Sequence, residues 1–361
     1  MIQWRRGVVA AVGRAWRGSL EIDVTAADGR MFHALAYPEL VGRPEVGDEV
    51  LLSVAALEMG LGTGGYALVV AIPSRLPEDA PLEGHMVKAR YTPLQTIVDG
   101  AEERYPELAS ASSLDGMPVV VADLHSALPA VLAGIRAERP AARVAYVMTD
   151  GGALPLWFSR TVDGLREAGW LTAGTVTVGQ AFGGDLECVT VHSGLLAARH
   201  VLNADIAVVT QGPGNLGTGT EWGFSGIACG EAVNAAAVLG GRPVAALRVS
   251  SGDARERHHG VSHHSLTAYG KVALARAEVA VPDVDDGFWH GVASQTAELA
   301  ARHTVVSVPV DGLDSALRSC PVKLSTMGRG LEQDYAAFLA SACAGRLAGV
   351  GCCQHYGMLH T

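Results

Sequence analysis

Residues 1–76 carry short runs in which apolar and polar positions alternate. Alternation with a period of two residues is typical of strands that bury one face. Gly, Asp and Pro separate the runs, and Asp28-Gly29 predicts a hairpin turn. Spacing of this kind is typical of a small antiparallel barrel. The pattern therefore predicts a small all-β, barrel-like domain over residues 1–76, with strands at 7–12, 20–25, 31–36, 49–54 and 66–72.

Residues 77–116 are expected to form a connector and a bridging helix. The stretch 72–84 is rich in proline, which suits an extended link between domains. Thr92 as N-cap, Pro93 at the first helical position and Gln95 three residues after the cap form a helix-start signature. The sequence thus predicts a helix that begins after Thr92 and bridges the two domains.

From residue 117 onward the pattern changes to continuous apolar runs that alternate with helical segments. Continuous apolar runs are typical of strands that are buried on both faces. Their alternation with helices predicts a Rossmann-like α/β domain over 117–346, with a doubly wound, mainly parallel sheet, followed by a flexible tail at 347–361. The expected strands lie at 118–122, 143–148, 175–178, 186–191, 205–210, 243–249, 278–281 and 304–309, and the expected helices at 127–138, 156–168, 194–202, 224–239 and 266–276.

Composition narrows the class of partner. The chain of 361 residues has a formal net charge of −10, and nucleic-acid phosphates are bound by basic surfaces, so no nucleic-acid partner is expected. The sequence has no run of eighteen apolar residues, so no membrane span is expected either. Six cysteines without disulfide or zinc-ribbon spacing, and an N-terminal segment interrupted by Arg14 and Arg17, favour a cytoplasmic protein. We expect a small-molecule partner, and for the barrel a role in interaction or homo-oligomer formation.

Polar side chains recur where the predicted parallel strands end. In an open parallel sheet, ligands bind outside the carboxyl ends of the strands, near the point where the strand order switches direction. Asp123, Asp150, Gly214 and His263 all belong to loops that follow such strands. We therefore expect these four residues to line one crevice.

The segment 248–267, RVSSGDARERHHGVSHHSLT, places four histidines within seven residues. Histidine donates, accepts or binds metal near neutral pH, and arginine holds carboxylate or phosphate with a fixed fork of donors. His259 or His263 is predicted to act as general acid or base, and Arg255 and Arg257 are predicted to bind an anion. Asp123 and Asp150 would then orient the histidine as the other catalytic residues.

Alternatively, the same side chains bind a divalent metal. The sequence does not identify any other cofactor. His259 and His263 are four residues apart, which on a helix would place both imidazoles on one face, although Gly260 argues against a helix there. The candidate ligands are His125, His259, His263, Asp123 and Asp150.

The run Gly212-Pro-Gly-Asn-Leu-Gly217 matches GxGxxG after a strand. A dinucleotide site would open its helix within the motif and carry an acid about 20 residues on, whereas here the loop continues through Trp222. Nicotinamide or flavin is therefore not expected, and an anion-holding loop competes with a plain glycine turn. The candidate ligand-binding residues are Gly212, Gly214, Gly217, Thr218, Arg255, Arg257, Gly184, Asp185 and Arg329.

The runs MTDGGALP, AFGGDLE, QGPGNLGTGT, RERHHGVSHH and PVKLSTMGRG together resemble a family of uncharacterised bacterial, mainly actinobacterial, proteins of similar length. The resemblance spans nearly the whole chain and implies that these segments form one unit. It transfers no catalytic role. From the residues we expect an enzyme, a hydrolase or group transferase rather than an oxidoreductase, that acts on a small anionic metabolite. The alternative is a non-catalytic sensor or interaction protein that binds such a metabolite.

Overall fold

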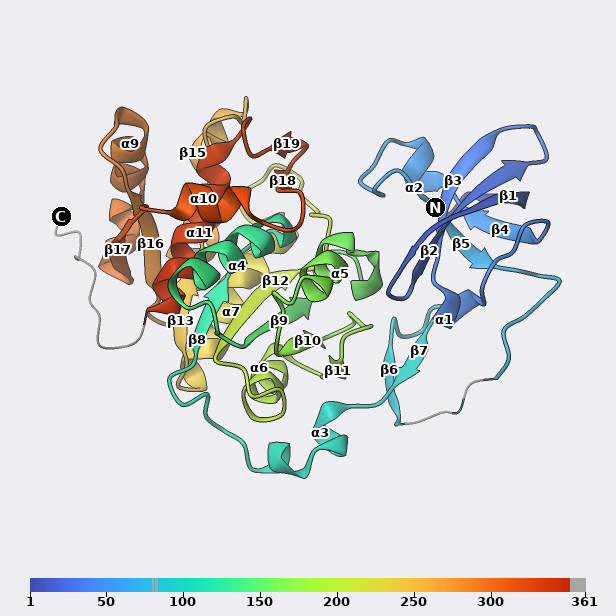
Figure 1. Ribbon diagram of the computed structural model, residues 1–361, viewed down its shortest axis with the longest axis horizontal. Helices are drawn as coiled ribbons and strands as arrows, with labels where there is room; N and C mark the ends of the chain where they lie inside the picture. Colours follow the sequence, from blue (N-terminus) through green and yellow to red (C-terminus); the bar gives the residue numbers. More distant parts are fainter. Residues whose placement is uncertain (80, 82–83, 351–361) are drawn as a thin grey trace. The chain divides into compact units, whose positions relative to one another are not determined.

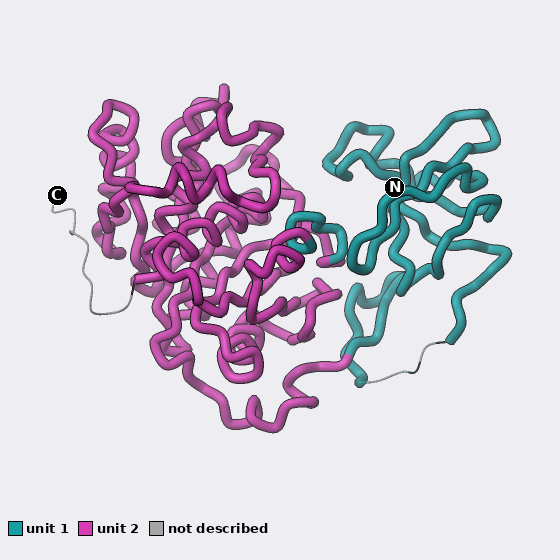
Figure 2. Tube along the Cα trace, in the orientation of Figure 1, with its two compact units in different colours: residues 1–98, 157–163 teal, residues 99–156, 164–361 magenta. Residues whose placement is uncertain are grey.

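The computed structural model describes residues 1–79, 81 and 84–350 (Figure 1). The chain divides into two compact units (Figure 2). The first comprises Met1–Val98 together with Trp157–Asp163, and the second comprises Asp99–Leu156 and the chain from Gly164 onward. The predicted fold class, a small β-barrel followed by an α/β domain with a parallel sheet, is confirmed.

The first unit is a closed barrel with the strand order β1-β2-β3-β5-β4. The long strand β1 pairs with both β2 and β4 in antiparallel fashion, which closes the barrel, whereas β3 and β5 are parallel. Alternate side chains such as Ile22 and Val24 fill the interior. At the predicted hairpin turn, Gly29 has a φ of +81°. The bounds are β1 (Trp4–Trp16), β2 (Ser19–Ala26), β3 (Met31–Ala36), α1 (Pro38–Val41), β4 (Glu49–Ser53), α2 (Ala55–Glu58) and β5 (Ala67–Ala71).

A segment from much later in the chain completes this unit. The Trp157 carbonyl accepts hydrogen bonds from Trp16 Nε1 at 2.6 Å and from Ser19 Oγ at 2.8 Å. The side chains of Trp157 and Phe158 pack against an apolar cluster that includes Tyr37. The barrel unit therefore uses residues that lie outside any contiguous N-terminal stretch.

The predicted bridging helix after Thr92 is wrong. A hairpin of β6 (Met86–Lys88) and β7 (Thr96–Val98) occupies this region, followed by α3 (Ala101–Arg104) and the short 3-10 helix η1 (Pro106–Ala109). Thr92 Oγ1 donates to the Ala89 carbonyl at 2.8 Å, and the Tyr91 amide donates to Gln95 Oε1 at 3.0 Å. The side chains that suggested a helix cap therefore close a turn, a use that Thr and polar amides serve equally well.

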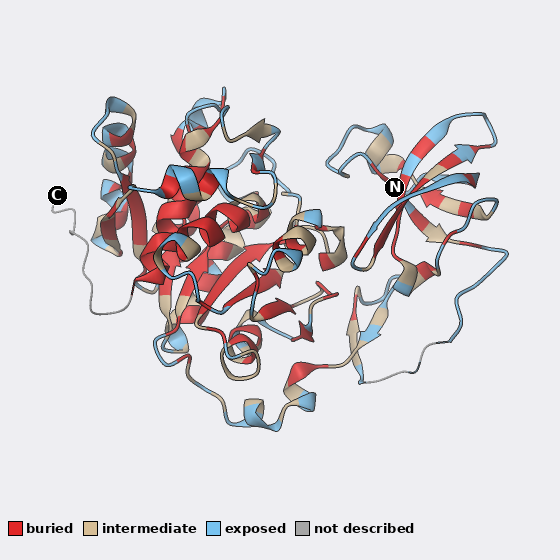
Figure 3. Ribbon diagram, in the orientation of Figure 1, coloured by how far each residue is buried: buried red, intermediate tan, exposed pale blue. Residues whose placement is uncertain are grey.

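The second unit is built on an eight-stranded, fully parallel sheet with the order β11-β10-β9-β12-β8-β13-β16-β17. Its central strands are buried on both faces, as Figure 3 shows, and their side chains are mostly apolar. The bounds are β8 (Pro118–Val121), β9 (Val144–Thr149), β10 (Gly174–Thr177), β11 (Leu186–Glu187), β12 (Ile206–Gln211), β13 (Arg242–Ala245), β16 (Glu278–Asp283) and β17 (Thr304–Pro309).

The neighbouring strands β12 and β8 mark the point where the strand order switches: the chain continues toward one edge of the sheet after β8 and toward the other edge after β12. The connection that follows β8 leads through α4 to β9 on one side, and the connection that follows β12 leads through α7 to β13 on the other. Right-handed crossovers place these two helices on opposite faces of the sheet. The loops after β8 and β12 therefore diverge and leave a crevice at their carboxyl ends. The helices are α4 (Leu128–Glu138), α5 (Arg160–Glu167), α6 (Val191–His200), α7 (Ala228–Val238), α9 (Gly287–Thr296), α10 (Leu313–Arg318) and α11 (Tyr335–Gly349).

Helices α4 and α11 pack with their backbones almost in contact. A Cβ atom at Gly134 would lie 1.9 Å from the Ala342 carbonyl oxygen, and one at Gly345 would lie 2.0 Å from the Val131 carbonyl oxygen. Helix α11 is buried along nearly its whole length. Its last turn includes residues 347–349, where the sequence predicted the start of a flexible tail, and residues 351–361 of that tail lie outside the described residues. None of the helices in the described part of the chain combines the length and the hydrophobicity that a membrane span requires.

Candidate functional site

The site lies at the carboxyl ends of β8 and β13. Asp123 follows β8 and is only 4% exposed. Its Oδ2 lies 3.6 Å from Nη1 of Arg248, which follows β13, and 3.8 Å from Nδ1 of His264. Among the described residues, no side chain or amide hydrogen-bonds to this oxygen. A buried carboxylate oxygen without a donor is costly, so Asp123 is held ready for a partner.

The histidines are positioned by a short hairpin and a helix start. Strands β14 (Val249–Ser250) and β15 (Gly260–Val261) return the chain to α8 (His263–Thr267). Ser262 caps α8, because its Oγ accepts from the His264 amide at 3.2 Å, and the same oxygen hydrogen-bonds to His258 Nδ1 at 2.7 Å. One hydroxyl therefore fixes both the helix start and the ring of His258.

Three imidazoles meet at this point. His258, His263 and His264 each offer a ring nitrogen, and these nitrogens all lie within 4.8 Å of one another. Phe224, from the loop after β12, stacks flat on His264 with ring centroids 3.8 Å apart. Arg248 Nη1 donates to His264 Nδ1 at 3.0 Å. The third histidine, His263, has a buried Nε2 without a hydrogen-bond partner among the described residues.

The surroundings of His258 and His263 keep these two rings uncharged. Burial lowers the pKa of His258 to about 3, and the nearby guanidiniums of Arg248 and Arg255 add to the effect. The pKa of His263 is also lowered, first by burial and then by His264 and Arg257. At neutral pH both imidazoles therefore present free lone pairs, which are needed to accept a proton or bind a metal.

A pocket opens beside the cluster, with a volume of about 460 Å³. His263, Arg257 and Lys271 line it. Lys271 is paired with Glu221, whereas no hydrogen bond or ion pair ties the exposed Arg257 to the residues that the structure describes. The pocket thus combines a guanidinium that is available to an anion with the imidazole whose Nε2 lacks a partner.

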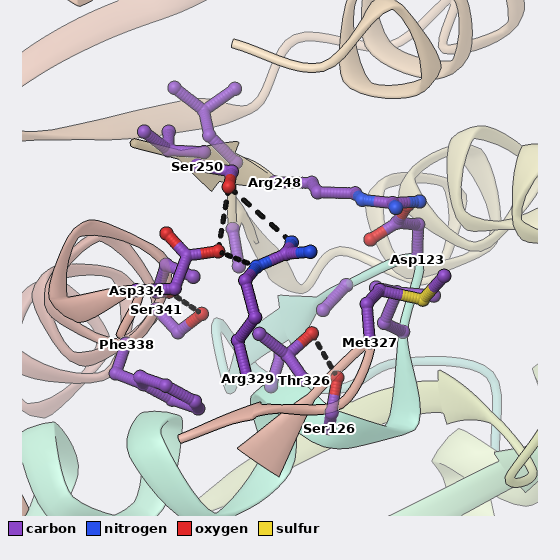
Figure 4. Close-up of a pocket in the computed structure, with 17 residues that line it drawn as sticks. Asp123, Ser126, Arg248, Ser250, Thr326, Met327, Arg329, Asp334, Phe338 and Ser341 are labelled. Atoms are coloured by element: carbon purple, nitrogen blue, oxygen red, sulfur yellow. Dashed lines mark hydrogen bonds and ion pairs between the residues drawn. The ribbon is translucent and has the colours of Figure 1, made fainter. Parts of the chain in front are cut away.

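Asp123 and Arg248 line a second, much smaller pocket, with a volume of about 30 Å³ (Figure 4). Ser126 and Thr326, whose hydroxyls are 3.0 Å apart, also line it. A space of this size holds a water molecule rather than a metabolite. The larger pocket is therefore the candidate for ligand binding.

Arg255 and Arg329 are engaged in ion pairs within the protein. Both guanidiniums bond to Asp253, and the hydrogen bonds from Arg255 lower the pKa of that carboxyl well below its ordinary range. Arg329 Nε also donates to the buried Asp334, which accepts from Ser250 Oγ at 2.6 Å (Figure 4). These two predicted anion-binding residues hold the loop after β14 in place.

The remaining predicted catalytic residues and metal ligands lie apart from the cluster. Asp150 is exposed and accepts from the Gln180 amide at 2.8 Å. His259 is exposed and contacts the edge of Phe288. His125 is buried, with its Nδ1 2.9 Å from the Tyr146 hydroxyl. Four residues, Asp123, Asp150, Gly214 and His263, were expected to line one crevice. Within the described chain, Asp123 and His263 are linked because His264 contacts both of them.

The predicted glycine-rich loops serve local geometry. Gly184 donates to Glu187, and Asp185 pairs with Arg166 and accepts from the Thr175 amide. After β12, the Gly212 amide donates to the Thr149 carbonyl, Gly214 has a φ of +92°, and the Thr218 amide donates to the Gly223 carbonyl. This loop, in which Gly217 bridges to Phe224, carries Phe224 onto His264 and Gly219 to the pocket wall.

Sequence reasoning missed Arg248, His258 and His264 as site residues. All three lie in the segment 248–267 that the sequence singled out, and the choice of His259 rested on a helical spacing. Arg248 is a charged residue near the carboxyl end of the apolar strand predicted at 243–249, which is the signal that could have identified it.

The buried His125 predicts a loss of stability in acid. Burial lowers its pKa to about 4 in the folded protein, against 6.5 for the ordinary group. Between these values the unfolded chain binds a proton that the folded chain does not, so stability is full above pH 6.5 and falls as the pH approaches 4. We expect this histidine to cost on the order of 3 kcal/mol by pH 4. Urea unfolding at several pH values should show a shallower acid loss in His125→Gln, and equal slopes would contradict this assignment.

Comparison with known protein families agrees with the resemblance to an uncharacterised family that the sequence motifs indicated. No curated protein matches the chain. One family model does match, over residues 33–345, and this range includes all five runs that carried the resemblance. Because the match covers far more than half of the sequence, and spans Asp123, Arg248 and the histidine cluster, the chain belongs to the family described as "Protein of unknown function (DUF3866)".

Proposed function

We propose that this protein is an enzyme, a hydrolase or group transferase, that acts on a small anionic metabolite in the pocket beside His263. One observation carries the proposal: the available guanidinium of Arg257 lines the same pocket as His263, whose buried Nε2 has no hydrogen-bond partner among the described residues. Arginine binds carboxylate or phosphate through a planar fork of donors. An uncharged imidazole beside the bound anion can take up a proton itself or help to hold a metal ion that activates water.

The geometry after β12 favours this reaction class over hydride transfer. In a dinucleotide site the glycine turn leads directly into a helix whose N-terminus faces the pyrophosphate. Here β12 ends at Gln211, and α7 begins only at Ala228. The intervening loop delivers Phe224 to His264 instead. Groups suited to proton transfer and hydrolysis therefore gather where a nucleotide-binding turn would otherwise lie.

The test is retention of anionic metabolites by the purified protein. We expect native mass spectrometry, after incubation with a cell extract, to show an anionic ligand on the wild type and at least tenfold less on Arg257→Ala. Arg199→Ala is the matched control, because this arginine pairs with Asp115 and lies outside the pocket lining. Retention by Arg257→Ala at the wild-type level would contradict the proposal.

Turnover separates the enzyme from a sensor. If the retained compound is converted, His263→Ala should slow its conversion by about 10²-fold or more while binding changes little. A ligand that the wild type binds but never converts would favour the alternative, a sensor that binds the same metabolite. The readout is product formation followed by mass spectrometry.

A further inference from the structure

Three histidines from two short elements converge on one point. His258 ends the 3-10 helix η5 (Glu256–His258), and His263 and His264 begin α8. Their candidate ligand nitrogens lie within 4.8 Å of one another. Around a tetrahedral zinc ion at about 2.0 Å, neighbouring nitrogens are about 3.3 Å apart, so small ring rotations suffice to close the set.

The hydrogen bonds decide which nitrogens remain for a ligand. Nδ1 of His258 bonds to Ser262 Oγ, and Nδ1 of His264 faces Arg248 and Asp123. This leaves Nε2 on both rings. Nε2 is also the atom of His263 that lacks a partner among the described residues. All three histidines thus have an Nε2 to offer.

Asp123 provides the partner that a metal-bound histidine requires. A ligating imidazole usually donates its other N–H to a carboxylate, which fixes the ring and raises its basicity. Asp123 Oδ2, which also has no hydrogen-bond partner among the described residues, lies 3.8 Å from His264 Nδ1. If Nε2 of His264 held a metal, its Nδ1 would carry the proton and could donate it to this oxygen, and Arg248 would give up its bond to Nδ1 while staying beside the same carboxylate. One bound ion would therefore give both Asp123 Oδ2 and His263 Nε2 a partner.

We infer that His258, His263 and His264 form a site for one divalent transition-metal ion, with zinc as the representative, and with Asp123 as the outer partner of His264. The choice of metal follows from the ligands and the charges. Imidazole suits zinc, copper, nickel and iron, whereas magnesium and calcium require oxygen ligands. The guanidiniums of Arg248 and Arg257 oppose any cation, so nitrogen coordination rather than charge must hold the ion.

Three protein ligands leave one coordination position open. His263 also lines the larger pocket, so we place the open position on the side of that pocket, where Arg257 would hold an anion. An open fourth position is the arrangement of catalytic rather than structural zinc sites. This role of the ion rests on the proposed function, whereas the binding of the ion does not.

The experiment measures metal binding by the full chain without substrate. Protein stripped with a chelator is titrated with zinc chloride by calorimetry, and native mass spectrometry counts the bound ions. We expect one zinc ion per chain in this site, at least 100-fold weaker binding for His263→Ala, and 10- to 100-fold weaker binding for Asp123→Asn, as for other outer-shell carboxylates. Magnesium should not compete.

His259→Ala is the matched control, because it removes an adjacent histidine that faces Phe288 instead of the cluster. His263→Gln, which keeps most of the side-chain volume, guards against misfolding, and near-UV circular dichroism checks each variant. Equal zinc affinity in the wild type and both His263 variants would overturn the site, as would a wild type that binds no zinc. Zinc binding without retention of an anionic metabolite would support the metal site and reject the proposed function. Retention of a metabolite without zinc binding would support the proposed function and reject the metal site.

Discussion

Gly134→Ala is expected to lower the free energy of unfolding by about 3 kcal/mol or more, since overpacking a rigid core costs about 1–3 kcal/mol and here the clash is with backbone. The new Cβ would lie 1.9 Å from the Ala342 carbonyl oxygen. Neither helix can yield locally, because α11 is buried against both α4 and the sheet. Urea unfolding followed by far-UV circular dichroism measures the change.

Gly291→Ala in α9 is the matched control. This glycine is also helical, but no atom lies within 4 Å of an added Cβ. Alanine should therefore stabilise the protein by about 0.5–1 kcal/mol through helix propensity alone. If both substitutions shift the urea midpoint in the same direction, close packing of α4 on α11 does not determine the stability of this unit.

Asp334→Ala is expected to cost about 3–5 kcal/mol, as for other broken buried ion pairs. The side chain of Asp334 is fully buried, and it accepts from Ser250 Oγ, the Ser251 amide and Arg329 Nε. Alanine leaves the Ser250 hydroxyl and the Ser251 amide without this buried acceptor, and it removes one of the two carboxylates that pair with Arg329. Thermal unfolding by calorimetry should show the loss.

Asp286→Ala provides the comparison. Asp286 caps α9 through the Trp289 amide at 2.8 Å, and removing such a cap costs about 1 kcal/mol. A loss at Asp334 no greater than the loss at Asp286 would mean that the loop after β14 is not held by this carboxylate.

The architecture was predictable because its signals are local. Period-two alternation before residue 77 and continuous apolar runs such as 206–210 each report how many faces of a strand are buried. Two features could not be predicted from the local sequence. Trp157 joins the barrel unit through contacts 141 residues away in sequence, and Thr92 carries a cap signature that a turn uses instead.

The site was predictable as a segment but not as a set of side chains. His259 and His263 have helical spacing, but Gly260 adopts a φ of +72° and begins β15, so His259 turns away from the cluster. Ser262 instead brings His258 into the set. Asp123 was identifiable because parallel strands end at one edge, whereas Asp150 follows β9, which β12 separates from β8.

The late arrival of β12 has a consequence for synthesis. Strands β8 and β9 lie on either side of β12, so their facing edges stay unpaired until residue 211 has left the ribosome. Unpaired apolar strands are templates for association with other chains. The nascent protein is therefore most vulnerable between the emergence of Thr149 and that of Gln211, and a chaperone that shields strand edges would act longest in this interval.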